Sequence, residues 1–334
     1  MRPHTGRAAT NTGSQQSFFR SLMSTPAKRR PGPDIYLYGM IVYSTIHRLA
    51  ADYPEADGYG EIEETHVVPG GETGNSALVL ARLGHRVKVG GPYLGTQTRI
   101  GVTSFLRQHG IDCSGLHYDA SFEGVRDLVL VGGKTRTVFG RFAAYFRGPK
   151  RWSAPDESAI AAARIVGLDP FFGAESERVA ECCAAIGRPY VTIDCPPDSR
   201  LHRAAAATVV SNEFLRSHFP RTEVRKLLRK YARESRGLVV FTFGGREILY
   251  ARGDGAIGCV RPNKVVVKST LGAGDTFRAG VIHGVLQGMD DRSIVQFAAA
   301  TAAAVCRRFP FALDPPGLQE ITLLAKGPTD RATS

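Results

Sequence analysis

The residues best suited to chemistry lie late in the chain, in the segment 268–277, which reads KSTLGAGDTF. Gly272, Ala273 and Gly274 leave room for backbone to approach a ligand closely. Apolar residues recur behind them at helical spacing, so the N–H groups of this loop are expected at a helix N-terminus, which favours an anion such as phosphate. Asp275 falls in the first helical turn, where it is placed to activate a hydroxyl toward phosphoryl transfer. On its own, the pattern is equally consistent with a tight turn in which Asp275 only caps the helix.

A second glycine-rich segment lies far upstream. Residues 70–77 read GGETGNSA, and the helix expected at 77–83 is closed by Gly84. Taken alone, this segment is a glycine turn that caps an amphipathic helix. Its glycines would also let backbone approach a ligand, and Asn75 offers an amide to hydroxyl groups.

The two segments, about 200 residues apart and in this order, together resemble the two signatures of the ribokinase-like (PfkB) carbohydrate kinases. The TLGAGD string is nearest to ketohexokinase-like members of that family. The resemblance covers about residues 34–320. It implies ATP-dependent phosphorylation of a hydroxyl on a sugar or sugar-like compound. Asp275 would be the general base, and Gly272, Ala273 and Gly274 would form the anion hole for the transferred group.

The resemblance also implies the contacts with the acceptor. Gly70, Gly71 and Asn75 would lie against the sugar, and Arg136 matches an arginine near the lid, although it also reads as a solvated hairpin residue. Ser44 is counted as the substrate-binding position at the end of the first strand.

Ser44 is itself a departure, since the family carries a carboxylate five residues after the first strand's glycine, here Gly39. A serine offers one neutral group where a carboxylate would grip two hydroxyls. We therefore expect poor activity on ribose and fructose, and an acceptor with fewer free hydroxyls or an added anionic group. The alternative is that another group, such as Glu64 from the lid, takes this role.

Nucleotide contacts follow from weaker matches. The family's N-x-x-E segment and its T-x-G-x-x-G turn correspond here to residues 212–215 and 242–247, with Leu215 and Glu247 as departures. The residues carried over as nucleotide-binding are Asn212, Thr242, Gly244, Gly245 and Thr270. Magnesium is expected with ATP because it neutralises phosphate charge. Glu213 or Asp194 would hold it through water, although a carboxylate in a loop after a strand is often only a cap.

Regular elements must position these groups. From residue 153 onward, helices alternate with short β-branched strands, which indicates a mostly parallel sheet flanked by helices. Two β-rich pieces, near 44–68 and 117–142, do not fit this layer and are assigned to a small β-lid. Strands are expected at 34–42, 61–68, 87–89, 164–168, 190–193, 208–211 and 238–241, and helices at 99–109, 156–163, 174–186, 222–235 and 294–307.

Amino-acid composition indicates which part of the chain folds as a globular domain. Of 334 residues, 43% are hydrophobic, which is ample for a globular core. Residues 1–33 hold six of the 43 basic residues and none of the 31 acidic ones, so half of the net charge of +12 lies there. This segment is expected to be a disordered basic tail, as is 326–334, leaving a kinase domain at 34–325. The tail could instead be a transit-like peptide, a nucleic-acid arm or the result of a start at Met23.

The sequence lacks the features of several other classes of protein. No apolar run approaches the roughly 18 residues of a membrane span, and six scattered cysteines without metal spacing fit a reducing, cytoplasmic compartment. We do not expect nucleic acid to bind the body of the protein. A nucleoside kinase and a non-catalytic relative with a binding role remain as alternatives, and lid strands that pair between subunits leave a homodimer open.

Overall fold

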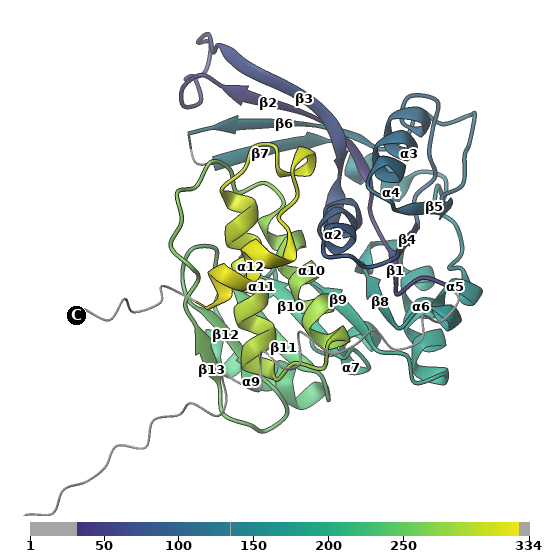
Figure 1. Cartoon of the computed structure of the whole chain (residues 1–334), viewed down its shortest axis with the longest axis vertical. Helices are drawn as coiled ribbons and strands as arrows, with labels where there is room; N and C mark the ends of the chain where they lie inside the picture. Colours follow the sequence, from purple (N-terminus) through teal and green to yellow (C-terminus); the bar gives the residue numbers. More distant parts are fainter. Residues whose placement is uncertain (1–31, 134, 327–334) are drawn as a thin grey trace, which may run out of the picture.

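The computed structural model describes residues 32–133 and 135–326, and Figure 1 shows the whole chain. The segments 1–33 and 326–334 that were expected to be disordered lie outside the described residues, apart from residues 32, 33 and 326. Within the described residues a nine-stranded sheet has the order β13-β12-β11-β10-β9-β8-β1-β4-β5. Its strands are β1 (Ile35–Tyr38), β4 (Val87–Gly90), β5 (Asp112–Gly115), β8 (Ile165–Leu168), β9 (Tyr190–Ile193), β10 (Ala207–Ser211), β11 (Leu238–Thr242), β12 (Ile248–Ala251) and β13 (Gly258–Val260).

The sheet is parallel except at one edge, where β12 pairs antiparallel with both β11 and β13. Its inner strands are buried on both faces, as parallel strands joined by crossover helices must be. The helices are α2 (Gly71–Arg82), α3 (Arg99–Gln108), α4 (Phe142–Arg147), α5 (Glu157–Ala162), α6 (Ala174–Ala185), α7 (Arg200–Arg203), α8 (Asn212–His218), α9 (Val224–Glu234), α10 (Ala273–Leu286), α11 (Asp291–Cys306) and α12 (Leu318–Ala325), with 3₁₀ turns η1 (Pro170–Phe172) and η2 (Phe311–Leu313).

The alternation of side chains along β1 shows how the two faces are covered. Ile35 and Leu37 belong to a core cluster shared with α2, α10 and α11. Tyr36 and Tyr38 belong to a second cluster shared with α5 and α6. The sheet therefore lies between two helical layers, which is the three-layer architecture expected from the alternation of helices and strands.

A separate four-stranded sheet, the lid, lies along one end of the molecule above α10 and α11, at the top of Figure 1. Its order is β3-β2-β6-β7, with β2 (Val42–Leu49), β3 (Ile62–Gly70), β6 (Arg126–Gly132) and β7 (Thr135–Gly140). The lid is built from two segments that are far apart in the chain, one carrying β2 and β3 and the other β6 and β7. The parallel pairing of β2 with β6 joins the two segments. A mostly parallel sheet flanked by helices, with a small β-lid, is thus confirmed.

Several local expectations were wrong. The strand expected at 34–42 is two strands in two different sheets, because the chain leaves the central sheet at Gly39, where it packs directly against Asp169. The helix expected at 77–83 already begins at Gly71, since this glycine adopts φ 78° and lets the chain turn straight from β3 into α2. Of the segment 117–142, only 126–140 forms the hairpin. No helix among residues 32–133 and 135–326 is long and apolar enough to cross a membrane.

Candidate active site

The loop that precedes α10 has the geometry expected of an anion-binding turn. Gly272 adopts the left-handed conformation with φ 77°, and a Cβ there would lie 2.5 Å from the Phe311 ring. Only glycine fits this position without strain. Helix α10 begins at the next residue, and Asp275 lies in its first turn.

The donors of this loop are not all free. The N–H of Ala273 donates to the carbonyl of Thr270 at 3.3 Å. The N–H groups of Gly272 and Gly274 donate to no acceptor in the described part of the chain. Two unengaged donors at the N-terminus of a helix form a site for an anion.

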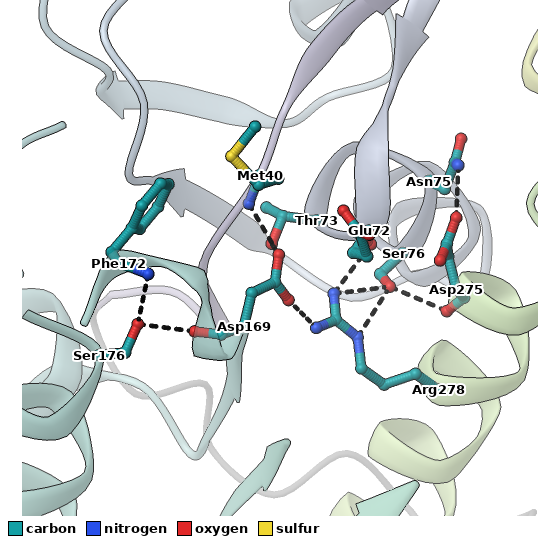
Figure 2. A network of polar contacts seen from close by, with 10 residues as sticks. All are labelled: Met40, Glu72, Thr73, Asn75, Ser76, Asp169, Phe172, Ser176, Asp275 and Arg278. Carbon is teal, nitrogen blue, oxygen red and sulfur yellow. Dashed lines mark hydrogen bonds and ion pairs between the residues drawn. The ribbon is translucent and has the colours of Figure 1, made fainter. Parts of the chain in front are cut away.

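Asp275 is held by the other glycine-rich segment. The amide Nδ2 of Asn75 donates to Asp275 Oδ2 at 2.7 Å, and Ser76 Oγ donates to the Asp275 carbonyl at 2.9 Å (Figure 2). These contacts join α2 to α10 across about 200 residues of chain. Asp275 Oδ1 accepts no hydrogen bond from any described residue, so one oxygen of this fixed carboxylate is available to a ligand.

Between the lid and the ends of α2 and α10 lies a cavity of about 350 Å³, which we name the lid cavity. It brings together all the residues expected to bind the acceptor, together with part of the loop before α10. Those lining it are Ser44, Gly70, Gly71, Asn75, Arg136, Gly272 and Asp275. Its remaining walls are mostly apolar, with Val42, Ile46, Val68, Val129, Val138 and Phe311 among them. A mainly apolar cavity with a few convergent polar groups is typical of a small-molecule site.

Two cavity residues were missed by the sequence reasoning. Glu72 lies in the first turn of α2, and burial together with the nearby charges of Asp275 and Asp169 raises its pKa to about 8. Asp127 lies on β6 directly opposite Ser44 of β2. A sequence signal for Asp127 did exist, because it is the single carboxylate in the otherwise apolar run 127–131 of a lid strand.

A buried ion pair supports the floor of this site. Arg278 of α10 pairs with Asp169 at the end of β8, and both side chains are completely shielded from solvent. The same Asp169 carboxylate accepts from the N–H of Met40 at 2.7 Å and from Thr73 Oγ1 at 3.0 Å (Figure 2). Arg278 also donates to the carbonyl of Glu72 at 2.8 Å. Burial raises the pKa of Asp169, and the Arg278 guanidinium and these hydrogen bonds oppose that rise.

A second, more open cavity of about 730 Å³ lies beyond the carboxyl ends of β10 and β11, and we name it the basic cavity. It contains two of the residues expected to bind nucleotide, Asn212 and Gly245. Four cationic side chains line it, namely Arg225, Arg246, Arg261 and Lys264, together with the carboxylates of Glu223 and Glu247. This charge suits a polyphosphate.

The other three residues expected to contact nucleotide do not line the basic cavity. Thr242 ends β11, and Gly244 follows it in a turn with φ 63°. Thr270 lies in the loop before α10, where its carbonyl accepts a hydrogen bond from the N–H of Ala273.

The two candidate metal-binding carboxylates differ in their surroundings. Asp194 accepts from the N–H of Ser211 at 2.7 Å and from its hydroxyl at 3.0 Å, so both oxygens are engaged. Burial raises the pKa of Asp194, and the charges of Asp275 and Glu213 add to the rise. Glu213 is exposed in the first turn of α8.

Among the described residues no group of three or more His, Cys, Asp or Glu side chains could hold a metal ion directly. The donor set of Asp194 and Glu213 fits only a hydrated Mg²⁺ that arrives on a nucleotide and keeps several of its waters.

Comparison with known proteins agrees with this architecture. The model of the pfkB family carbohydrate kinases matches residues 37–312. A nucleoside kinase from Methanothermobacter thermautotrophicus is 27% identical over 295 residues, which are 81% of this chain and 89% of that protein.

Solved structures share the fold at lower identity. Ribokinase from Arabidopsis thaliana, complexed with ribose and ATP, superposes with a TM-score of 0.73 at 18% identity, covering 88% of this chain and 99% of that one. Nucleoside kinase from Methanocaldococcus jannaschii superposes with a TM-score of 0.68 at 16% identity, with the same coverage.

A mostly parallel sheet between two helical layers, a β-lid over a cavity, and a glycine loop with an aspartate at a helix N-terminus together define a ribokinase-like kinase. The family match covers most of the chain. The protein belongs to the pfkB family of carbohydrate kinases.

Proposed function

We propose that this protein transfers the γ-phosphoryl group of ATP to a hydroxyl of a sugar, a sugar-like compound or a nucleoside. The observation that carries the proposal is the setting of Asp275. One of its oxygens is held by Asn75, the other accepts no hydrogen bond from the described residues, and the residue lines the lid cavity beside unengaged backbone donors. A carboxylate fixed in this way is placed to accept a hydroxyl proton from a bound acceptor.

In the proposed reaction, each of the two cavities binds one substrate. ATP lies with its phosphates toward the basic cavity, where Arg225, Arg246, Arg261 and Lys264 supply positive charge. The acceptor occupies the lid cavity. Its hydroxyl gives its proton to Asp275, its oxygen forms a bond to the γ-phosphorus, the bond from that phosphorus to the β–γ bridging oxygen breaks, and ADP leaves.

The anion hole stabilises the charge that develops on the transferred group. The N–H groups of Gly272 and Gly274 donate to its oxygens, and each such donor typically contributes about 3 kcal/mol to transition-state stabilisation. The engaged N–H of Ala273 contributes less in this conformation. Arg136, which lines the lid cavity, supplies a cation from the lid side.

Magnesium fits this arrangement as a nucleotide-bound ion. It would neutralise phosphate charge, and the carboxylates of Asp194 and Glu213 would hold it through its waters. The charges of Asp275 and Glu213 both raise the pKa of Asp194, which supports a common site at this end of the sheet.

A nucleoside acceptor is the second candidate, and the relative of 27% identity, a nucleoside kinase, favours it. A coupled assay of ADP formation with ATP, Mg²⁺ and a panel of sugars and nucleosides separates the candidates. Turnover with free sugars but not nucleosides supports a carbohydrate kinase, and the reverse supports a nucleoside kinase. Absence of turnover with every compound, although ATP binds, would support a non-catalytic relative instead.

The protein is further proposed to act as a homodimer through the lid. Two apolar side chains on the lid, Val67 and Phe139, are 46% and 53% exposed, and β3 and β7 are the two edge strands of that sheet. Sedimentation of the wild type and of Val67→Lys checks this, because a charge at a paired apolar surface should yield monomers. A monomeric wild type would contradict it.

A cytoplasmic location is the matching proposal for the cell. The six cysteines are free thiols in this structure, which suits a reducing compartment. Fractionation of cells that express a tagged chain tests it.

A further inference from the structure

The inner face of the lid carries the carboxylate of Asp127. It lies beside Ser44, the position at which the family has a carboxylate. In the parallel pairing of β2 and β6, Ser44 lies directly opposite Asp127, and Ile46 lies opposite Val129. All four of these residues line the lid cavity. The side chain of Asp127 therefore belongs to the row that faces the acceptor.

Asp127 has no cationic partner. None of the ion pairs among the described residues includes it, and its neighbour Arg126 pairs with Glu123 at 3.7 Å. On the other side, β7 places Gly140 opposite Asp127, so no side chain covers the carboxylate from that strand. Across the strand pair, the hydroxyl of Ser44 is the side-chain group whose hydrogen bonding lowers the pKa of Asp127.

This carboxylate is also incompletely satisfied. Its Oδ1 is shielded from solvent and has no hydrogen-bond partner in the described structure. Burial raises the pKa of Asp127, and the hydrogen bond from Ser44 opposes the rise. A buried polar atom without a partner is unfavourable and rare in native proteins, so its presence in a cavity indicates that a ligand completes the site. The broad Cβ–Cγ torsion of aspartate lets either oxygen turn toward that ligand.

The chemistry of the cavity limits what that ligand is. Three carboxyl groups line it, those of Glu72, Asp127 and Asp275, against the single guanidinium of Arg136. Burial and its neighbours raise the pKa of Glu72 to about 8, so near pH 7 this group is a hydrogen-bond donor and the two aspartates carry the negative charge. Such a cavity disfavours an additional negative charge and favours groups that donate hydrogen bonds. A carboxylate accepts two charge-assisted hydrogen bonds from a pair of adjacent hydroxyls.

We propose that Asp127, with Ser44 as its hydrogen-bond donor, binds a pair of adjacent hydroxyls on the acceptor and so takes over the role that a carboxylate at position 44 has in related kinases. The proposal rests on the proposed kinase function, and it specifies the acceptor as a neutral compound with a vicinal diol. It replaces the expectation, drawn from Ser44 alone, that ribose is a poor acceptor and that an anionic group is preferred.

The carboxylate considered earlier, Glu64, lies in a different setting. It pairs with Arg48 at 3.4 Å and with His66 at 2.9 Å, and it does not line the lid cavity. Glu64→Gln is therefore a matched control, since it removes a lid carboxylate without touching the cavity.

The test compares two pairs of probes that differ by one hydroxyl of the diol: ribose with 2-deoxyribose, and adenosine with 2′-deoxyadenosine. Binding is measured by calorimetry without ATP, and KM and kcat are measured with ATP and Mg²⁺. We expect the wild type to prefer the diol compound of at least one pair by about tenfold to a hundredfold, the usual effect of hydrogen bonds to a charged group. Asp127→Asn should remove most of that preference by weakening the diol compound, with a larger change in KM than in kcat.

Four further variants sharpen the result. Ser44→Ala should lose part of the preference, and Glu64→Gln should keep it. Ser44→Asp alone should bind the diol compounds poorly, because two carboxylates would then face each other across adjacent strands. The exchange Ser44→Asp with Asp127→Ser should recover part of the preference.

Stability distinguishes binding from a structural role. Asp127→Asn should melt at or above the temperature of the wild type, since it removes a buried, unpartnered charge. A lowered melting temperature together with an unchanged preference for the diol would overturn the proposal, as would failure of all four probes to bind the wild type. If a diol compound binds in an Asp127-dependent manner but receives no phosphoryl group, this assignment stands and the kinase function fails for those acceptors.

Discussion

At the residue scale, the site depends on how Asp275 is held. The hydrogen bond from Asn75, 2.7 Å long, fixes one carboxylate oxygen and leaves the other toward the lid cavity. Asn75 therefore orients the proposed base from within the cavity, a role that its expected contact with acceptor hydroxyls did not include.

Replacement of the proposed base gives the first prediction. Asp275→Asn should lower kcat by at least about a hundredfold, the low end for loss of a general base. The affinity for ATP should change little, because the free N–H groups of Gly272 and Gly274 remain. Steady-state kinetics and nucleotide binding measured on the same preparation check both parts. Turnover within tenfold of the wild type would remove Asp275 from the proposed chemistry.

A second residue-scale prediction concerns pH. Burial and neighbouring carboxylates raise the pKa of Glu72 to about 8, so the folded protein binds a proton there more tightly than the unfolded chain does. Its contribution to stability is present below the ordinary glutamate range and is lost as pH rises through that range toward 8. Glu72→Gln should remove this loss.

Melting temperatures from pH 5 to pH 9 provide the measurement. The difference between wild type and Glu72→Gln should move steadily against the wild type as pH rises. Glu55→Gln, at an exposed position, is the matched comparison because it makes the same chemical change outside the cavity. A flat profile for Glu72→Gln would mean that Glu72 ionises as an ordinary glutamate.

Sequence reasoning at this scale succeeded where a motif combines residue type with spacing. The GAGD and GGxxxN motifs identified Asp275 and Asn75 as candidate site residues. In the structure both line the lid cavity, although about 200 residues separate them. It missed Asp127 because that residue acts through strand pairing. Which residue faces Ser44 depends on the register of β2 against β6, and no local pattern reports that register.

At the element scale, the start of α10 is set by Gly272. Its φ of 77° and the 2.5 Å approach of the Phe311 ring leave no room for a side chain. Gly272→Ala should therefore destabilise the fold by about 1–2 kcal/mol through the left-handed backbone alone. It should also lower kcat, because the anion hole shifts with the loop.

The matched control for this substitution is Gly274→Ala. A Cβ at Gly274 would meet no atom within 4 Å, and its position within the helix favours alanine. Equilibrium unfolding of both variants decides the point. Equal stability of the two would show that the conformation of Gly272 is not what shapes the loop.

Element boundaries show what periodicity can and cannot predict. The buried strands β8, β9 and β11 were found because short β-branched runs between helices have few alternative structures. The start of α2 was missed because the glycines of 70–74 are typical of a loop in the sequence. In the structure, the positive φ of Gly71 turns the chain directly from β3 into the helix. The break between β1 and β2 was missed for a similar reason, because the close packing of Gly39 on Asp169 is a tertiary contact.

At the scale of the whole molecule, the ion pair of Arg278 and Asp169 connects the end of β1, helix α2, the end of β8 and helix α10 (Figure 2). Because both charges are fully buried, removal of one leaves the other uncompensated. Arg278→Met should destabilise the protein by about 3–5 kcal/mol. Denaturant unfolding measures this directly.

The double variant Asp169→Asn with Arg278→Met should recover much of that loss, because no buried charge remains. An exposed pair provides the control: Arg178 and Glu157 are 59% and 55% exposed, and Arg178→Met should cost less than about 1 kcal/mol. A small effect of Arg278→Met alone would show that water reaches the pair.

The same ion pair has a consequence for synthesis on the ribosome. Asp169 emerges 109 residues before Arg278, so at 5–20 residues per second its counter-ion follows roughly 5–20 s later. Until then the carboxylate cannot be buried at low cost, and the edge of the nascent sheet that carries β8 and β1 should stay open to solvent. Nascent chains arrested shortly before and well after residue 278 should therefore differ sharply in protease resistance near residue 169. Closure of the floor of the site is thus timed by the synthesis of α10, the helix that carries Arg278.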